Sequence, residues 1–217
     1  MARLRAVIFD MDGTLIDSLE SVPVAYIATV EELTGRACTV EEVVASYSVG
    51  PGKAMLSALL GRRCEENDLA LYHDHLRRNM YLIRTYPSVK ASLATLAATL
   101  KVGVFTGAGR GAAELLLAHA GLRKYFGVVV TGDDVLRPKP APDGIRATCE
   151  ALGVSPKEAA YVGDAPNDMQ AAIAAEVLAV LAGWGHQYEP STQADLVISD
   201  PTRLVHLLQA ELPPRVE

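Results

Sequence analysis

The chain has 217 residues, half of them hydrophobic and 21% charged, with a net charge of -6 at pH 7. This length allows one well-packed domain, or one domain that carries a smaller inserted one, and the acidic balance gives no support for nucleic-acid binding. No stretch approaches the roughly 20 apolar residues that span a bilayer, and three scattered cysteines fit a reducing compartment. We therefore expect a cytoplasmic protein without nucleic-acid or membrane partners.

Residues 6–9 form a short apolar run that predicts a buried strand of a parallel sheet. Asp10 ends this run, Asp12 lies two residues further on, and Gly13 predicts a turn. Ligands bind beyond the carboxyl ends of strands in an open parallel sheet. Two carboxylates there repel each other unless a cation lies between them, and Mg2+ suits a site that also holds a phosphate. Taken alone, an Asp-x-Asp-Gly run is also common in solvated turns and calcium loops.

The next region predicts helices and no convincing strand. Ser18 is a candidate N-cap, and Gly35 predicts the end of the first helix. Thr39 and Glu42 have the spacing of a capping box for the second helix, which runs towards residue 47. Two further helices are expected over 54–60 and 65–83, after a turn that ends at Lys53. Residues 18–84 are therefore expected to form an all-helical insert.

Strands and helices alternate in the rest of the chain, with Ser88 as a candidate cap after Pro87 ends the insert. Such alternation with short loops predicts a doubly wound, Rossmann-like parallel sheet of the α/β class, built from residues 1–17 and 85–217. The strands are expected at 102–105, 128–130, 160–162, 178–181 and 196–198, and the helices at 89–100, 112–120, 143–152, 169–175 and about 201–212.

Polar residues suited to phosphate chemistry follow several of the predicted strands. In a Rossmann-like sheet these strand ends converge on one crevice. A hydroxyl and free backbone N–H groups after a strand can cradle phosphate oxygens, and flanking prolines hold a lysine in place so that it loses less entropy on binding. The groups are Asp10 with Asp12, Thr106 with Gly107, Lys139 between prolines, and Asp164 with Asp168.

Residues 10–17 resemble the first motif of the haloacid dehalogenase (HAD) superfamily, Asp-x-Asp-Gly-Thr-Leu-x-Asp. Residues 105–107, 139–142 and 163–168 are similar to the second, third and fourth motifs, although many relatives have Asn where this chain has Gly107. The resemblance covers nearly the whole chain. It implies a Rossmann-like core with a C1 cap, a helical lid that closes over the active site.

The resemblance implies a catalytic role for each carboxylate. Asp10 would attack phosphorus and form an aspartyl-phosphate, while Asp12 would protonate the leaving alkoxide and then deprotonate the hydrolytic water. Mg2+ would be held by Asp10, Asp164 and the backbone carbonyl of Asp12. Asp168 would orient the metal or Lys139 from outside the ligand shell.

Cationic and small residues would hold the phosphate and the rest of the substrate. The resemblance implies that Thr106, Gly107 and Lys139 steady charge on the phosphoryl oxygens. Lys53, just after a Gly-Pro-Gly turn of the insert, is a candidate for substrate recognition from the cap, against the alternative of an exposed lysine at a helix start. Arg110 could serve the same purpose at the rim.

Subgroup features narrow the expected activity. Dehalogenases and phosphonatases lack the second aspartate of the first motif, so Asp12 disfavours both. Residues 49–53, 132–135 and 163–172 look like phosphoglycolate phosphatases and their near relatives. We therefore expect a HAD-type phosphoric monoester hydrolase, Mg2+-dependent and acting on a small phosphorylated, phosphoglycolate-like metabolite, as a monomer or homodimer. A sugar-phosphate mutase, a pyrophosphatase and, less strongly, a catalytically silent binding protein stay open as alternatives.

Overall fold

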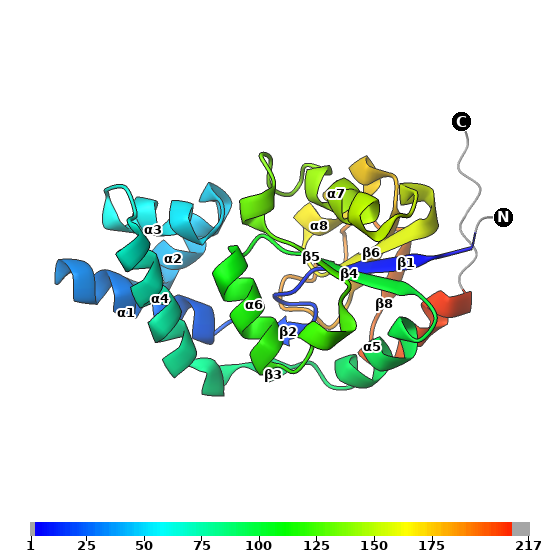
Figure 1. The fold of residues 1–217 in the computed structure, drawn as a ribbon, viewed down its shortest axis with the longest axis horizontal. Helices are drawn as coiled ribbons and strands as arrows, with labels where there is room; N and C mark the ends of the chain where they lie inside the picture. The colour runs from blue at the N-terminus through cyan, green and yellow to red at the C-terminus, as the bar shows by residue number, and fades with distance from the viewer. Residues whose placement is uncertain (1–2, 210–217) are drawn as a thin grey trace.

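A six-stranded parallel sheet forms the core of the computed structural model, which describes residues 3–209 (Figure 1). The strand order is β5-β4-β1-β6-β7-β8. The central strand β1 is fully buried and pairs with a neighbour on each side, so that Ala6 lies opposite Lys101 and Ala159. The strands are β1 (Ala6–Phe9), β4 (Lys101–Phe105), β5 (Val128–Val130), β6 (Ala159–Gly163), β7 (Leu178–Ala182) and β8 (Leu196–Ile198). The predicted doubly wound α/β fold is confirmed.

Helices cover both faces of this sheet because each strand presents alternate side chains to opposite sides. Val7 and Phe9 pack in one hydrophobic cluster with residues of α5 and α6, whereas Ala6 and Ile8 pack in a second cluster with residues of α7 and α8. The helices are α5 (Val89–Ala97), α6 (Arg110–His119), α7 (Asp143–Leu152) and α8 (Pro166–Ala175), with 3-10 turns at Arg123–Tyr125, Gly132–Asp134 and Pro156–Glu158.

Four further helices form a separate group beside the sheet, drawn in blue to cyan-green in Figure 1. They are α1 (Ser21–Thr34), α2 (Val40–Ser46), α3 (Gly52–Leu60) and α4 (Glu66–Arg78), with 3-10 turns at Tyr47–Val49 and Met80–Leu82. The chain enters and leaves this group through two short antiparallel strands, β2 (Ile16–Asp17) and β3 (Arg84–Thr85), with Ile16 opposite Thr85. The exact division into residues 1–17 with 85–217 and residues 18–84 stays a prediction.

The predicted helix ends agree with the structure in part. Gly35 ends α1 in a left-handed conformation with φ 67°, and the capping box of Thr39 and Glu42 is present on α2. Ser18 is not the cap of α1, because the helix begins at Ser21 and the Ser18 hydroxyl donates to Asp12 instead.

Two other predicted ends differ from the structure. Ser88 precedes α5, but its side chain makes no capping hydrogen bond and its φ is 66°. The last predicted helix is a 3-10 helix over Pro201–Gln209, and residues 210–212 of that prediction lie outside the described residues. Over residues 3–209, none of the helices has the combined length and apolarity that crossing a bilayer requires.

Candidate active site

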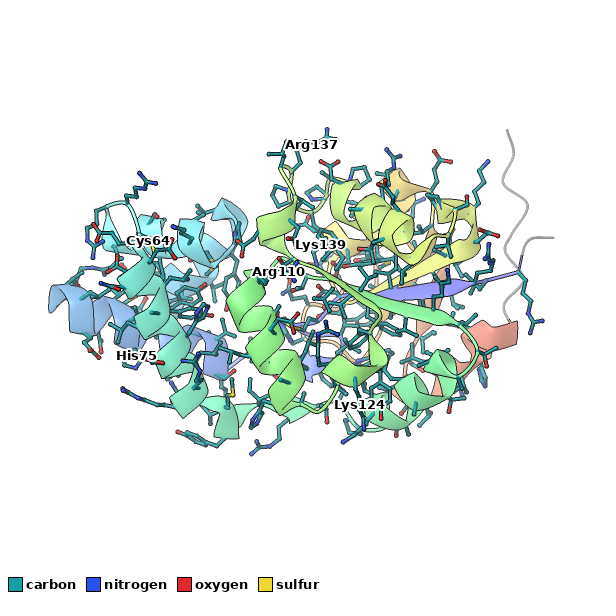
Figure 2. The ribbon with its side chains drawn as sticks, viewed as in Figure 1. Cys64, His75, Arg110, Lys124, Arg137 and Lys139 are labelled. Atoms are coloured by element: carbon teal, nitrogen blue, oxygen red, sulfur yellow. The ribbon has the colours of Figure 1, made fainter. Side chains whose placement is uncertain are left out.

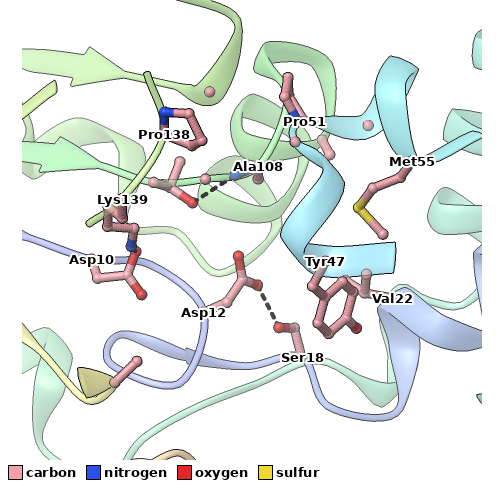
Figure 3. A pocket seen from close by; sticks show the side chains of 18 of the residues that line it. Asp10, Asp12, Ser18, Val22, Tyr47, Pro51, Met55, Ala108, Pro138 and Lys139 are labelled. Atoms are coloured by element: carbon pink, nitrogen blue, oxygen red, sulfur yellow. Dashed lines mark hydrogen bonds and ion pairs between the residues drawn. The ribbon is translucent and has the colours of Figure 1, made fainter. Parts of the chain in front are cut away.

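The carboxyl ends of β1, β4 and β6 meet the helical group at a cavity of about 250 Å³ (Figure 3). Asp10 follows β1, Thr106 follows β4 and Asp164 follows β6. All three line the cavity, together with Asp12 and Lys139. The topology therefore brings together side chains that are up to about 150 residues apart in sequence, as the neighbouring ends of parallel strands require.

Lys139 is the cationic centre of the site. Its ammonium donates to Asp10 Oδ1 and to Asp168 Oδ1, each at 2.7 Å. Burial alone lowers the pKa of this ammonium, but the carboxylates of Asp10 and Asp168 outweigh that effect and raise it well above the ordinary value. Lys139 therefore stays charged in the interior, whereas Arg137 lies at the periphery (Figure 2).

Burial raises the pKa of Asp10 well above its ordinary value. The charge of Lys139 opposes this shift, while the nearby carboxylates of Asp168 and Asp164 add to it. A single ammonium is therefore too little to neutralise the buried acids. Such a site gains stability from a further cation.

Asp164 is held by backbone and hydroxyl donors. The N–H of Gln187 donates to Asp164 Oδ2 at 2.9 Å, and the Thr14 hydroxyl donates to Asp164 Oδ1 at 3.4 Å. Glycines surround the carboxylate: a Cβ at Gly13 would lie 2.4 Å from Asp164 Oδ2, and one at Gly185 would lie 2.1 Å from Asp164 Cβ. Both positions therefore need a residue without a side chain. Burial raises the pKa of this carboxyl too, although the Gln187 N–H lowers it.

Three carboxylates are close enough to hold one metal ion. Asp10, Asp164 and Asp168 each offer an oxygen, and these atoms lie within 4.8 Å of one another. Buried carboxylate oxygens are the ligands that Mg2+ prefers. Both Asp168 oxygens are already engaged, one by Lys139 and the other by the N–H of Ala165 at 3.0 Å, which favours its predicted place outside the ligand shell.

Asp12 is separate from this group of three. Its carboxylate faces the cavity and accepts a hydrogen bond from Ser18 (Figure 3). Burial raises the pKa of Asp12, and the hydrogen bond from Ser18 lowers it by a smaller amount. A carboxyl with a raised pKa that does not pair with the Lys139 ammonium is suited to donate and accept protons.

The end of β4 forms a tight polar turn. The Thr106 hydroxyl is buried and accepts the N–H of Ala108 at 3.1 Å, which Figure 3 marks with a dashed line. Gly107 lines the cavity beside it, and a Cβ at that position would meet nothing within 4 Å. The turn therefore leaves open space where a phosphate can approach the backbone.

Lys53 and Arg110, the two other predicted substrate contacts, do not line this cavity. Lys53 forms an ion pair with Glu66, within the helical group. Arg110 forms an ion pair with Asp134 and also donates to the backbone carbonyl of Val129 at 3.3 Å. The structure therefore does not bring these two cations together with the other candidate residues.

Several residues in or beside the cavity are not among the predicted site residues. Ser18 lies just after the first motif, and Gln187 comes two residues after the turn Gly183-Trp184-Gly185 that follows β7. Both residues could have been suspected from those positions. Tyr161 lies inside β6, and its hydroxyl donates to the carbonyl of Phe105 at 3.0 Å beneath Lys139. The helical group also lines the cavity with aromatic and apolar residues, which are Leu19, Val22, Tyr26, Tyr47, Met55 and Tyr72.

Comparison with known proteins agrees with this geometry. The family model described as haloacid dehalogenase-like hydrolase matches residues 7–182. The chain belongs to the haloacid dehalogenase-like hydrolase family. A phosphoglycolate phosphatase from Aquifex aeolicus is 30% identical over 94% of this chain and 97% of its own length. A pyrophosphatase from Bacillus velezensis is 29% identical over 94% of this chain and 96% of its own length.

A solved structure supports the fold of this family member. The crystal structure of CbbY from Rhodobacter sphaeroides in complex with phosphate superposes with a TM-score of 0.81, covering 95% of this chain and 100% of that one at 23% identity. The predicted family, fold and enzyme class, a phosphatase of the haloacid dehalogenase type, are confirmed by these comparisons.

Proposed function

We propose that this chain hydrolyses a small phosphate monoester, with Mg2+ as its cofactor and Asp10 as the nucleophile that carries the phosphoryl group. The supporting observation is the group formed by Asp10, Lys139, Asp168 and Asp164 at the carboxyl end of the sheet. An ionised carboxylate beside a fixed ammonium, on the sheet side of the cavity, is what attack on phosphorus requires.

The chain's own residues supply each step. The ammonium of Lys139 favours the ionised form of Asp10 and lies 2.7 Å from its Oδ1 atom. Thr106 and Gly107 border the space for the phosphoryl oxygens. Asp12 protonates the leaving oxygen as Asp10 bonds to phosphorus, and it then takes a proton from the water that hydrolyses the aspartyl-phosphate.

Mg2+ fits the carboxylate oxygens of Asp10 and Asp164, with Asp168 behind them and the backbone carbonyl of Asp12 as a further proposed ligand. A divalent ion bound there would neutralise the phosphate charge and the buried acids. The raised pKa values of Asp10 and Asp164, caused first by burial, are what such an ion would relieve.

The relatives indicate a small phosphorylated metabolite as the substrate class, since several are named phosphoglycolate phosphatases. We also propose a cytoplasmic location and a monomeric or homodimeric state.

The alternative activity is that of a sugar-phosphate mutase, which would convert a sugar phosphate into its isomer rather than release phosphate. Product analysis therefore separates mutase from phosphatase activity.

The test is hydrolysis of an aryl phosphate by the wild type, Asp10→Asn and Asp143→Asn, each with Mg2+ and with a chelator. Asp143 is a matched aspartate at the surface, where it pairs with Arg137. We expect phosphate release from the wild type and from Asp143→Asn only with Mg2+, and none from folded Asp10→Asn. Undiminished activity of Asp10→Asn would refute the nucleophile, and full activity with the chelator would refute the cofactor.

A further inference from the structure

The cavity has two chemically different sides (Figure 3). The sheet side carries Asp10, Asp12, Asp164, Asp168 and the ammonium of Lys139. The opposite side comes from residues 18–84, and every lining residue of that segment in the described structure is uncharged. These residues are Ser18, Leu19, Val22, Tyr26, Tyr47, Gly50, Pro51, Gly52, Met55 and Tyr72.

The uncharged side is a packed aromatic and apolar surface. Tyr26 and Tyr72 stack with ring centroids 4.2 Å apart and an interplanar angle of 26°. Both are buried, as is Met55, which points towards the cavity from α3 (Figure 3). Burial raises the pKa of both tyrosines above the ordinary value, so their hydroxyls stay neutral. This surface can pack against carbon atoms and donate hydrogen bonds, but it offers no compensating charge.

The helical group already rests on the core in this structure. A Cβ at Gly132 would lie 3.0 Å from Pro51 Cβ, and one at Gly111 would lie 2.3 Å from His73 Cε1. Even with this contact made, Lys53 pairs with Glu66 and stays outside the cavity. Lys139 is the only lysine or arginine that lines the cavity among the described residues, and two aspartates engage it.

We infer that the organic group of the substrate is uncharged. The site takes a phosphate monoester whose carbon portion is apolar or carries only hydroxyl groups, rather than a carboxylate or a second phosphate. A second anion there would face the neutral phenols and thioether of residues 18–84 and, among the described lining residues, no lysine or arginine other than Lys139, so it would lose its hydration without gaining an opposite charge of its own. This inference rests on the proposed function and narrows its substrate class.

Two small esters make a matched test. In 2-hydroxyethyl phosphate a hydroxymethyl group replaces the carboxylate of 2-phosphoglycolate, and the rest of the molecule is the same. The wild type with Mg2+ is assayed for phosphate release from each ester at the same fixed pH. We expect kcat/KM to be at least about tenfold higher for the hydroxyethyl ester, because an unpaired buried charge costs at least that factor.

A charge introduced on the cap side tests the cause of this preference. Met55→Lys places an ammonium among the lining residues, whereas Val44→Lys places one on the exposed surface of α2 and is the matched control. We expect Met55→Lys to shift the kcat/KM ratio towards 2-phosphoglycolate by about tenfold, equal to about 1.4 kcal/mol, and Val44→Lys to leave it unchanged.

The outcomes separate this inference from the proposed function. Equal or better hydrolysis of 2-phosphoglycolate by the wild type would overturn the inference and leave the phosphatase proposal intact. A folded Met55→Lys protein with an unchanged ratio would also overturn it. If Met55→Lys does not fold, the wild-type ratio alone decides. Failure to hydrolyse either ester or an aryl phosphate would overturn the proposed function, and the inference with it.

Discussion

Asp12 differs from Asp10 and Asp168 in its hydrogen-bond donor. Asp10 and Asp168 share the ammonium of Lys139, whereas Asp12 accepts a hydroxyl hydrogen bond from Ser18. A neutral donor stabilises the ionised form less than an ammonium does. Asp12 can therefore alternate between its protonated and ionised states during one turnover, while the Lys139 ammonium and the proposed Mg2+ favour the ionised form of Asp10 that attacks.

Asp12→Asn is expected to lower kcat by about 100- to 10,000-fold, the usual contribution of a positioned acid–base group. With an aryl phosphate, whose leaving group needs little protonation, the second step should suffer more because the hydrolytic water loses its base. Rapid-quench measurements should then find phosphoryl-enzyme accumulating in the variant. Asp12→Asn turnover equal to the wild type would contradict this role.

Lys139→Met is expected to destabilise the protein, because it leaves Asp10 and Asp168 without their shared cation. Removing one partner of a buried ion pair costs about 3–5 kcal/mol. Arg137→Met, two residues away, breaks an exposed pair with Asp143 and should change stability far less. Denaturant unfolding in the presence of a chelator compares the two variants. Equal losses of unfolding free energy in the two variants would contradict the claim that Lys139 stabilises the buried acids Asp10 and Asp168.

At the scale of elements, the turn after β1 leaves the space that the carboxylate of Asp164 occupies. Gly13 has φ 81°, and a Cβ there would meet the carboxylate of Asp164. Gly35 has φ 67° at the end of α1, with nothing within 4 Å of such a Cβ. The two glycines share the need for a left-handed backbone but differ in what surrounds them.

Gly35→Ala is expected to cost about 1–2 kcal/mol of unfolding free energy, the penalty for a left-handed alanine, with no change in Mg2+ dependence. Gly13→Ala should carry the same penalty and also displace Asp164, so activity should need a higher Mg2+ concentration. Titration of activity against Mg2+ for both variants measures this. An identical midpoint for Gly13→Ala and the wild type would contradict the proposed position of the ion.

Strands with a contiguous apolar run could be predicted from the sequence, including the three-residue strands β5 and β8, whereas the two-residue strands could not. The buried runs that became β1, β4, β6 and β7 were found because their apolar residues are contiguous. The two-residue strands β2 and β3 are too short to carry any periodicity, and they form only through their mutual pairing.

The candidate site divides in the same way. Asp10, Thr106 and Asp164 stand directly after β1, β4 and β6, so the sheet topology determines where they meet. Lys139 lies in the loop between β5 and α7, and the prolines beside it are its signal in the sequence. Lys53 and Arg110 form ion pairs with Glu66 and Asp134. Neither a motif nor a spacing in the sequence indicates these two pairings. The cavity-lining tyrosines of the helical group resemble ordinary core residues in the sequence, and only tertiary packing places them on the cavity.

At the scale of the whole molecule, the metal-free fold buries three neighbouring carboxyl groups, those of Asp10, Asp164 and Asp168, around the single ammonium of Lys139. Burial raises the pKa of Asp10 and Asp164, so in the folded metal-free protein these two carboxyls keep their protons to a higher pH than in the unfolded chain. Stability is therefore expected to fall as the pH rises. The raised pKa of Lys139 contributes no slope there, because the ammonium is charged in both states.

Melting temperatures at about pH 6 and about pH 8 test this linkage, with a shift of about 2–4 °C for each kcal/mol in a chain of this size. With a chelator, the protein should melt at a lower temperature at the higher pH. Mg2+ should remove most of that difference, since it replaces the bound protons. Groups outside the site, such as His73, whose pKa burial lowers, act equally with and without Mg2+ and cancel in the comparison. A pH dependence that Mg2+ leaves unchanged would contradict this account.

Chemical trapping of the phosphoryl-enzyme tests the role of Asp10 most directly. The wild type is mixed with a phosphate monoester and Mg2+, quenched in acid within one turnover, digested and analysed by mass spectrometry. We predict a phosphoryl group on the peptide that contains Asp10, lost on treatment with hydroxylamine and absent from Asp10→Asn. A phosphoryl group on another residue, or steady phosphate release with no labelled peptide, would contradict the account.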